Sequence, residues 1–246
     1  MPSFRSTVFA AAVALAALVP AAHAQGMPDD QRRAIEQVVR EYLLKHPEVI
    51  VEAINELQRR ERADEEQKAR QALSENRAKL LDDPASPVGG NPKGDITVVE
   101  FFDYQCGYCK AVVADVQRLM KDDAKLRFVY KELPILGAAS VTASKAALAA
   151  RGQGKYEAFH YALMGHRGPL DEATIFRLAG SVGLDTERLK KDMDTPEVQQ
   201  VIGANLALAE KLGIRGTPGF VIGQQIVPGA IKLDDMKKLV AEARKG

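Results

Sequence analysis

Hydrophobic positions divide the chain into an N-terminal helical part and a C-terminal part that alternates strands and helices. Between Asp29 and about Asp82 apolar residues recur at helical spacing, first over Ile35 to Leu43 and again over Val49 to Leu57. His46-Pro47 separates these stripes, because the residue before a proline is pushed out of the helical region. From Gln58 to Gln71 nearly every side chain is charged or polar, which predicts a helix without a face to bury.

A cluster of prolines and glycines at residues 83–93 interrupts the helical part. We expect a hinge there, between a helical region at residues 25–82 and a second domain at residues 94–246. The two apolar stripes of the helical region are too small to form a stable core alone, because short chains bury too little surface. The stripes could fold back on the second domain, but the charged stretch and the hinge favour association between copies of the chain.

The second domain begins with a strand at residues 96–102, which is rich in β-branched and aromatic residues. The remaining pattern predicts, in order, a helix at 110–122, a strand at 126–136, a helical insert at about 137–212, short strands at 220–222 and 226–227, and a closing amphipathic helix at 233–245. The order β-α-β, helical insert, β-β-α predicts an α/β fold.

The first 24 residues have the three-part pattern of a secretory signal peptide. Arg5 provides the positive start, Val8 to Val19 the apolar run, and Ala22-His23-Ala24 the small-residue ending. A membrane anchor is the alternative, but the run is shorter than the about 20 residues that span a bilayer. We therefore expect cleavage after Ala24 and export of the mature protein.

Charge argues against a nucleic-acid partner. Arg5 is the only charged residue before Ala24, so removing residues 1–24 takes the formal net charge from +1 to zero. A neutral chain has no strong electrostatic attraction to nucleic acid or to an anionic surface.

The chain contains two cysteines, Cys106 and Cys109. A disulfide between them closes a loop too small to constrain the unfolded chain much, so the pair is better suited to reactivity than to stability. The motif follows a strand and starts a helix, where free N–H groups favour a Cys106 thiolate. Cys109, one turn later, can resolve a mixed disulfide, and Gly107 and Tyr108 between them tune the stability of the thiolate.

Other uses of the two thiols have weaker support. Zinc needs further cysteine or histidine ligands, and one of the four histidines lies in the signal peptide. A c-type haem site needs histidine after the second cysteine, where this chain has Lys110. We therefore predict no metal and no cofactor. Copper(I) binding by the two thiolates stays open as an alternative, because soft ligands suit that ion.

Two segments resemble the DsbA-like family of the thioredoxin superfamily. Phe101 to Lys110 is similar to the family's active-site region, and Gly216-Thr217-Pro218-Gly219-Phe220 to its cis-proline loop. The resemblance implies a thioredoxin-like fold with a helical insert, in which Pro218 faces the two cysteines and the Thr217 backbone pairs with substrate. An ordinary turn with a trans Thr217–Pro218 bond is the alternative.

Glu100 is the one charged residue in the first strand. A carboxylate among apolar residues is costly unless paired, and such groups often transfer protons. Glu100 matches the buried acid that the resembled family has before its cysteine motif, and by the same similarity Lys131 is its possible partner. Alternatively, Glu100 points to solvent at the sheet edge.

The N-terminal segment Tyr42 to Ile50 resembles ScsC-like members of the family, of the suppressor-of-copper-sensitivity type. In some such members this region joins three chains into a disulfide isomerase, whereas others are monomers. The resemblance implies a periplasmic, oligomeric isomerase or reductase that acts on cysteine-containing exported proteins and is reset by a membrane redox partner. A monomeric dithiol oxidase is the alternative, and Pro47 prevents one continuous coiled-coil seam.

Overall fold

The strand β2 (Ile96–Phe102) lies at the centre of a five-stranded sheet and has the bounds that its sequence predicts. In the computed structural model, which describes residues 27–245, the strand order is β1-β3-β2-β4-β5. β2 pairs in parallel with β3, and the other neighbours are antiparallel. β3 (Leu126–Glu132) and β4 (Gly219–Ile222) flank β2, and β1 (Val88–Gly90) and β5 (Gln225–Pro228) are the edge strands.

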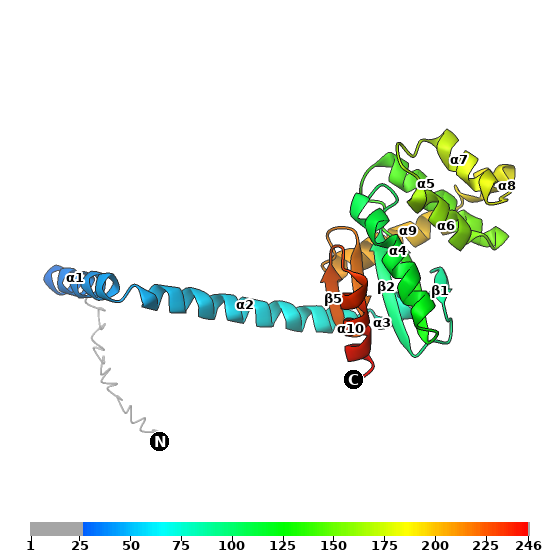
Figure 1. The fold of residues 1–246 in the computed structure, drawn as a ribbon. Coiled ribbons are helices and arrows are strands. Elements are labelled where there is room, and N and C mark those ends of the chain that lie inside the picture. The colour runs from blue at the N-terminus through cyan, green and yellow to red at the C-terminus, as the bar shows by residue number, and fades with distance from the viewer. Residues whose placement is uncertain (1–26, 246) are drawn as a thin grey trace, which may run out of the picture. The chain divides into compact units, whose positions relative to one another are not determined.

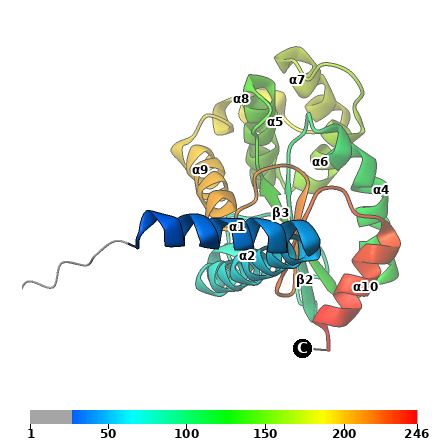
Figure 2. The ribbon, with the colours of Figure 1, turned by 90° about the vertical axis from the view of Figure 1, so that its left-hand side faces the viewer.

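Helices cover both faces of this sheet (Figure 2). On one face, α4 (Gly107–Asp122) and α10 (Leu233–Ala243) bury their apolar sides against the sheet. On the other face lie α3 (Arg77–Leu81), the end of α2 (Glu48–Glu75) and the end of α9 (Pro196–Lys211). The cysteine motif therefore starts a helix that is anchored on one defined face.

The predicted helical insert consists of several short helices that gather at one end of the sheet (Figure 1). Two of them begin at an aspartate whose side chain accepts a hydrogen bond from the helix backbone, a frequent way to start a helix. The helices before α9 are α5 (Ala138–Ala149), the 3₁₀ helix η1 (Ala150–Gln153), α6 (Tyr156–Gly165), α7 (Glu172–Ser181) and α8 (Thr186–Asp192).

Alternation along the strands separates two hydrophobic cores. Val98 and Phe102 of β2 face the core below α4 and α10, and Val99 and Phe101 face the core below α3 and α9. This alternation decides which side chains of neighbouring strands can meet, because successive residues point to opposite faces.

Two compact units divide the chain between Arg59 and Arg60. In the N-terminal unit, α1 (Asp29–Lys45) ends before His46-Pro47, as predicted, and α2 then begins. No residue of α1 is buried, and large apolar side chains of α1 and of the first part of α2 are 47–72% exposed. These exposed side chains are Ile35, Val38, Val39, Tyr42, Leu44, Ile50, Val51, Ile54 and Leu57.

The boundary between the two units does not coincide with the hinge expected at residues 83–93. Val88–Gly90 forms the edge strand β1, and Leu73 and Leu80, before the expected hinge, are buried in the second core. Residues 60–93 therefore belong to the C-terminal unit. A three-residue strand with two glycines has too little strand propensity to be recognised from sequence.

The predicted signal peptide at residues 1–24 lies outside the described residues. Within residues 27–245, no helix combines the length and the apolar character needed to cross a membrane.

Candidate active site

Cys106 occupies the N-cap position of α4, directly after the loop that follows β2. The backbone N–H of Cys109 donates a hydrogen bond to the Cys106 Sγ over 3.2 Å, so the Cys106 side chain caps the helix start. Cys106 is 5% exposed, whereas Cys109 is fully buried. Both thiols are free and both residues are buried, Cys106 less completely than Cys109.

The environment of Cys109 opposes its ionisation. Burial raises the pKa of the Cys109 thiol well above its ordinary value, and the hydrogen bond with Cys106 and the charge of Glu100 raise it further. Two thiols one helical turn apart therefore lie in different surroundings, which suits different roles for them.

The cis-proline loop meets the cysteine motif. The Thr217–Pro218 peptide bond is cis, in agreement with the resemblance and not with the trans alternative. The Cys106 thiol donates a hydrogen bond to the Thr217 carbonyl oxygen over 3.2 Å. The structure thus brings together two motifs that lie about a hundred residues apart in sequence.

Between the cysteines, Gly107 and Tyr108 lie at the surface. Tyr108 is 73% exposed. A Cβ at Gly107 would meet no atom within 4 Å, so space does not require glycine there. Among residues 27–245 no group of three or more His, Cys, Asp or Glu side chains is arranged to hold a metal ion.

Glu100 is buried, with 4% of its surface exposed, so the alternative of a solvent-facing carboxylate is wrong. Burial raises the pKa of Glu100 to about 8, from an ordinary value of 4.5. By alternation along β2, Glu100 points to the sheet face covered by α4, which carries Cys109, and its charge raises the pKa of that thiol.

The predicted partnership of Glu100 with Lys131 is wrong. Lys131 pairs in register with Phe101 rather than with Glu100, so its side chain points to the opposite face of the sheet. There the Lys131 Nζ lies 3.0 Å from the Asp83 carboxylate and donates to the Lys79 carbonyl oxygen over 2.8 Å. Lys131 thus anchors the chain segment before β1 and does not serve the thiols.

Asp103 fixes the loop before Cys106, a role that sequence reasoning missed. Its carboxylate accepts hydrogen bonds from Gln105 N at 2.7 Å, Ser140 Oγ at 2.7 Å and Leu136 N at 2.9 Å. Its carbonyl oxygen accepts from Cys106 N. The partners after β3 are distant in sequence, so only the short Asp103–Gln105 turn gave a local signal.

A second buried acid, Glu132, also escaped the sequence analysis. Its carboxylate accepts hydrogen bonds from the hydroxyls of Tyr156 at 2.8 Å, Ser144 at 2.9 Å and Tyr104 at 3.1 Å. Burial raises the pKa of Glu132 to about 8 although these donors oppose the shift. The carboxyl therefore joins the active-site loop at Tyr104 to the helical insert.

We expect Glu132→Ala to lower the free energy of unfolding by about 3 kcal/mol, because it leaves buried hydroxyls without their acceptor. Urea unfolding followed by circular dichroism measures this loss. Tyr156→Phe is the control, since it removes one donor and leaves the acid, and should cost about 1 kcal/mol. Equal stability of Glu132→Ala and the parent protein would contradict a structural role for this cluster.

Two family models match this chain, and one of them covers the residues of the site. Residues 97–241, which include both cysteines and the cis-proline loop, match the family model of the DSBA-like thioredoxin domain. Residues 31–64 match the model of the copper resistance protein ScsC N-terminal domain.

Two solved structures are similar over most of their length. A thioredoxin-like oxidoreductase from Silicibacter pomeroyi DSS-3 shares 53% identity with a TM-score of 0.69, over 70% of this chain and 99% of that one. Proteus mirabilis ScsC in a transitional conformation shares 34% identity with a TM-score of 0.66, over 88% of this chain and 98% of that one.

Among curated proteins, the Na(+)/H(+) antiporter NhaA 1 of Salinispora arenicola is 27% identical over 168 residues. The match covers 68% of this chain but 26% of the antiporter, so the chain spans about a quarter of the length of that relative.

Proposed function

Since the chain belongs to the DsbA-like thioredoxin family, we propose that it is a periplasmic disulfide isomerase or reductase that acts on cysteine-containing exported proteins. The observation that carries this proposal is the placement of the Cys106 sulfur at the start of α4, 3.2 Å from the Thr217 carbonyl oxygen. A reactive thiol beside an accessible backbone loop suits a substrate that is itself a polypeptide.

The reaction is an exchange of sulfur–sulfur bonds. The Cys106 thiolate attacks one sulfur of a client disulfide, a Cys106–client bond forms, and the other client sulfur leaves as a thiolate. Cys109 then attacks Cys106, which releases the reduced client and leaves the Cys106–Cys109 disulfide. Two electrons pass to the client, and a membrane redox partner that supplies two electrons resets the dithiol. In isomerisation a client thiol instead attacks the mixed disulfide, with no net electron transfer.

Cys109 has to lose a proton before it can attack, and its burial opposes this loss. Glu100 is the acid whose charge acts on this thiol, and burial raises its pKa to about 8. A carboxyl with a pKa near the working pH can both take and return a proton. We therefore assign to Glu100 the transfer of the Cys109 proton.

We expect Glu100→Gln to slow release of client from the mixed disulfide by about a hundredfold, because general-base assistance to Cys109 is lost. The parent rate should rise with pH through about 8, and the variant rate should lack this rise. Stopped-flow release of a fluorescent peptide from its disulfide with Cys106 measures both rates.

Glu132→Gln is the matched control, since burial also raises the pKa of Glu132 to about 8 but Tyr104, Tyr156 and Ser144 are its partners. Its release rate should retain the dependence on pH. A Glu100→Gln variant that releases client at the parent rate at every pH would exclude proton transfer by Glu100.

Stability should respond to pH in the same variants. Because burial raises the pKa of Glu100 above its unfolded value, the folded state keeps the proton between about pH 4.5 and 8 while the unfolded state loses it. The free energy of unfolding therefore falls as pH rises through this window. Glu100→Gln should be less sensitive to pH than the parent protein in chemical unfolding curves recorded at pH 5 and pH 8. An unchanged pH dependence in Glu100→Gln would contradict a buried, titrating Glu100.

The N-terminal unit supports an oligomer. Its exposed apolar side chains would be covered if the same faces met between copies of the chain, and symmetric association is the common arrangement. Residues 31–64 match the model of the ScsC N-terminal domain, and we propose a trimer on the resemblance to the ScsC-like members in which this region joins three chains. We propose residues 27–59 as the association region.

A monomeric dithiol oxidase is the competing function. Light scattering on the mature protein, combined with assays on scrambled and on reduced client proteins, separates the two. An oligomer that restores native disulfides in a scrambled client supports the proposal. A monomer that only oxidises reduced clients would replace it with the oxidase function.

A further inference from the structure

Lys110 and Arg167 form a positively charged rim beside the cysteine motif. Lys110 lies one helical turn after Cys106, and its backbone N–H donates to the Cys106 carbonyl oxygen over 3.1 Å. Side chains four residues apart share one face of a helix, with Cβ atoms about 5–6 Å apart. A helical side chain also leans toward the N-terminus of its helix, which in α4 is the end that carries Cys106. The Lys110 side chain therefore lies next to the turn that holds the nucleophile.

A loop of the helical insert holds this lysine in place. The half-buried Lys110 donates from its Nζ to the His166 carbonyl oxygen over 2.7 Å, and His166 belongs to the loop between α6 and α7. The next residue in that loop is Arg167, which is exposed. Partial burial lowers the pKa of Lys110, and the charge of Arg167 lowers it further. The two positive charges are thus close enough to repel each other.

Among residues 27–245, no carboxylate forms an ion pair with either of these cations. The charge of Asp103 does act on Lys110, but the Asp103 carboxylate is buried and already accepts three hydrogen bonds. Asp171, at the start of α7, accepts a hydrogen bond from the Thr174 N–H over 2.8 Å. Two cations without a paired acid, beside a reactive sulfur, attract an anionic group of the substrate.

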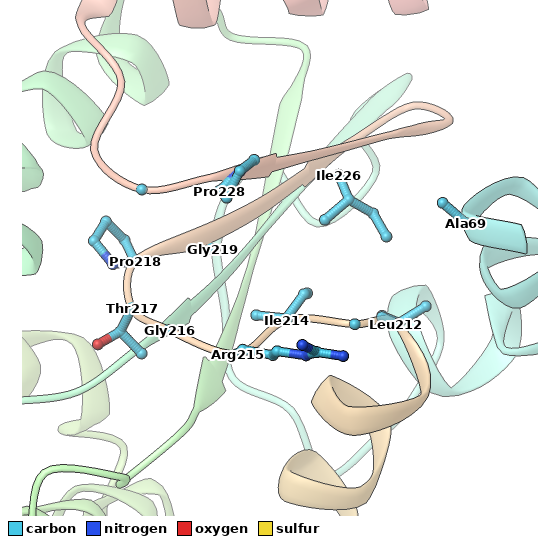
Figure 3. A pocket seen from close by; sticks show the side chains of 12 residues that line it. Ala69, Leu212, Ile214, Arg215, Gly216, Thr217, Pro218, Gly219, Ile226 and Pro228 are labelled. Carbon is cyan, nitrogen blue, oxygen red and sulfur yellow. The ribbon is translucent and has the colours of Figure 1, made fainter. Parts of the chain in front are cut away.

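The cis-proline loop does not supply a comparable charge. Thr217 and Pro218 lie at one end of a groove in which Arg215 is the charged residue of the lining (Figure 3). The Arg215 side chain extends along the groove in the direction away from Thr217 (Figure 3). Charge selection beside Cys106 therefore depends on α4 and on the loop of the helical insert.

We propose that Lys110 and Arg167 bind an acidic side chain of the client polypeptide, one or two residues from the cysteine that bonds to Cys106. This inference rests on the proposed function and adds a substrate preference to it. An extended chain covers about 3.3–3.6 Å per residue, so a side chain at that position spans the one helical turn between Cys106 and Lys110. The attraction brings acidic segments of a client to the thiol and leaves the exchange of sulfur–sulfur bonds as described above.

Two peptides test the preference. In both, the cysteine forms a disulfide with 2-mercaptoethanol, and the residue two positions away is aspartate or asparagine. The rate constant with the reduced protein is divided by that with free 2-mercaptoethanol, which removes the intrinsic reactivity of each peptide. We expect this ratio to be about tenfold higher for the aspartate peptide at about 0.01 M salt, because each charge pair about 6 Å apart in water contributes about threefold. At about 1 M salt, where screening acts over about 3 Å, the preference should fall below about twofold.

Charge substitutions at two positions locate the preference. Arg167→Gln should reduce it to about threefold and Arg167→Glu should abolish it, because one and then two units of charge are removed. Lys121→Gln and Lys121→Glu are the matched controls, since Lys121 is exposed in the last turn of the same helix, about 22 Å from Cys106 at about 1.5 Å per residue. Both Lys121 variants should retain the preference and the parent rate with bis(2-hydroxyethyl) disulfide, a neutral substrate.

The outcomes separate this inference from the proposed function. If the parent protein exchanges bis(2-hydroxyethyl) disulfide but reacts equally with both peptides at low salt, the acidic preference is wrong and the proposed function stands. Equal loss of preference in the Arg167 and Lys121 variants would assign the effect to net charge and overturn the site. A preference that persists undiminished at about 1 M salt would also contradict recognition by charge. Failure of the parent protein to exchange the neutral disulfide would remove the proposed function itself.

Discussion

Cys109→Ser is expected to accumulate mixed disulfides between Cys106 and client proteins, whereas Cys106→Ser should reduce exchange to the uncatalysed rate. Cys106 caps α4 beside the Thr217 loop and is less deeply buried than Cys109, so we expect a client disulfide to approach its sulfur first. Cys109 is fully buried and its pKa is raised, so it needs the attack of Cys106 before it can act. Without Cys109 the client stays bonded to Cys106.

Non-reducing gel electrophoresis and mass spectrometry after acid quenching measure the trapped species. Alkylation of the reduced protein near pH 6 provides an independent readout, in which Cys106 should be labelled first. Labelling of Cys109 first, or trapping by Cys106→Ser, would reverse the assignment of nucleophile and resolving thiol.

The parts of the fold that sequence predicts best have local signals. The run of β-branched and aromatic residues at 96–102 gives β2 with the same bounds, and the proline at position 47 separates α1 from α2. The second predicted strand, 126–136, is shorter in the structure and ends at Glu132, before Pro134. β1 was missed, because Gly89 and Gly90 carry no strand signal and its place depends on pairing with β3.

The site shows the same difference between local and long-range signals. Cys106 and Cys109 are three residues apart, so helix geometry alone predicts that they lie one turn apart. The error on Lys131 arose because β3 pairs with β2 in a register that places Tyr130, and not Lys131, opposite Glu100. Glu132 has a role only through tyrosines and a serine from distant segments, and a single sequence does not show such contacts.

Truncation of the N-terminal unit tests whether association produces isomerase activity. The structure sets the cut after residue 59 and not at residue 82, because Leu73 and Leu80 belong to the second core and Lys131 donates to the Lys79 carbonyl oxygen. The protein that begins at Arg60 should be a monomer with an intact active site. A truncation at residue 82 is the contrasting variant and should lose stability, since it removes these contacts.

We expect the protein without residues 25–59 to exchange cystamine at the parent rate but to lose most activity on scrambled clients. Linked active sites reach about millimolar local concentrations with a suitable tether, so a client held by one Cys106 meets a second one before it escapes. A lone dithiol instead releases its product after a single exchange, which favours oxidation of reduced clients. Light scattering gives the mass of each form, and recovery of activity of a scrambled client enzyme measures isomerisation. Equal isomerisation by both forms, or a monomeric parent protein, would exclude association as the source of the activity.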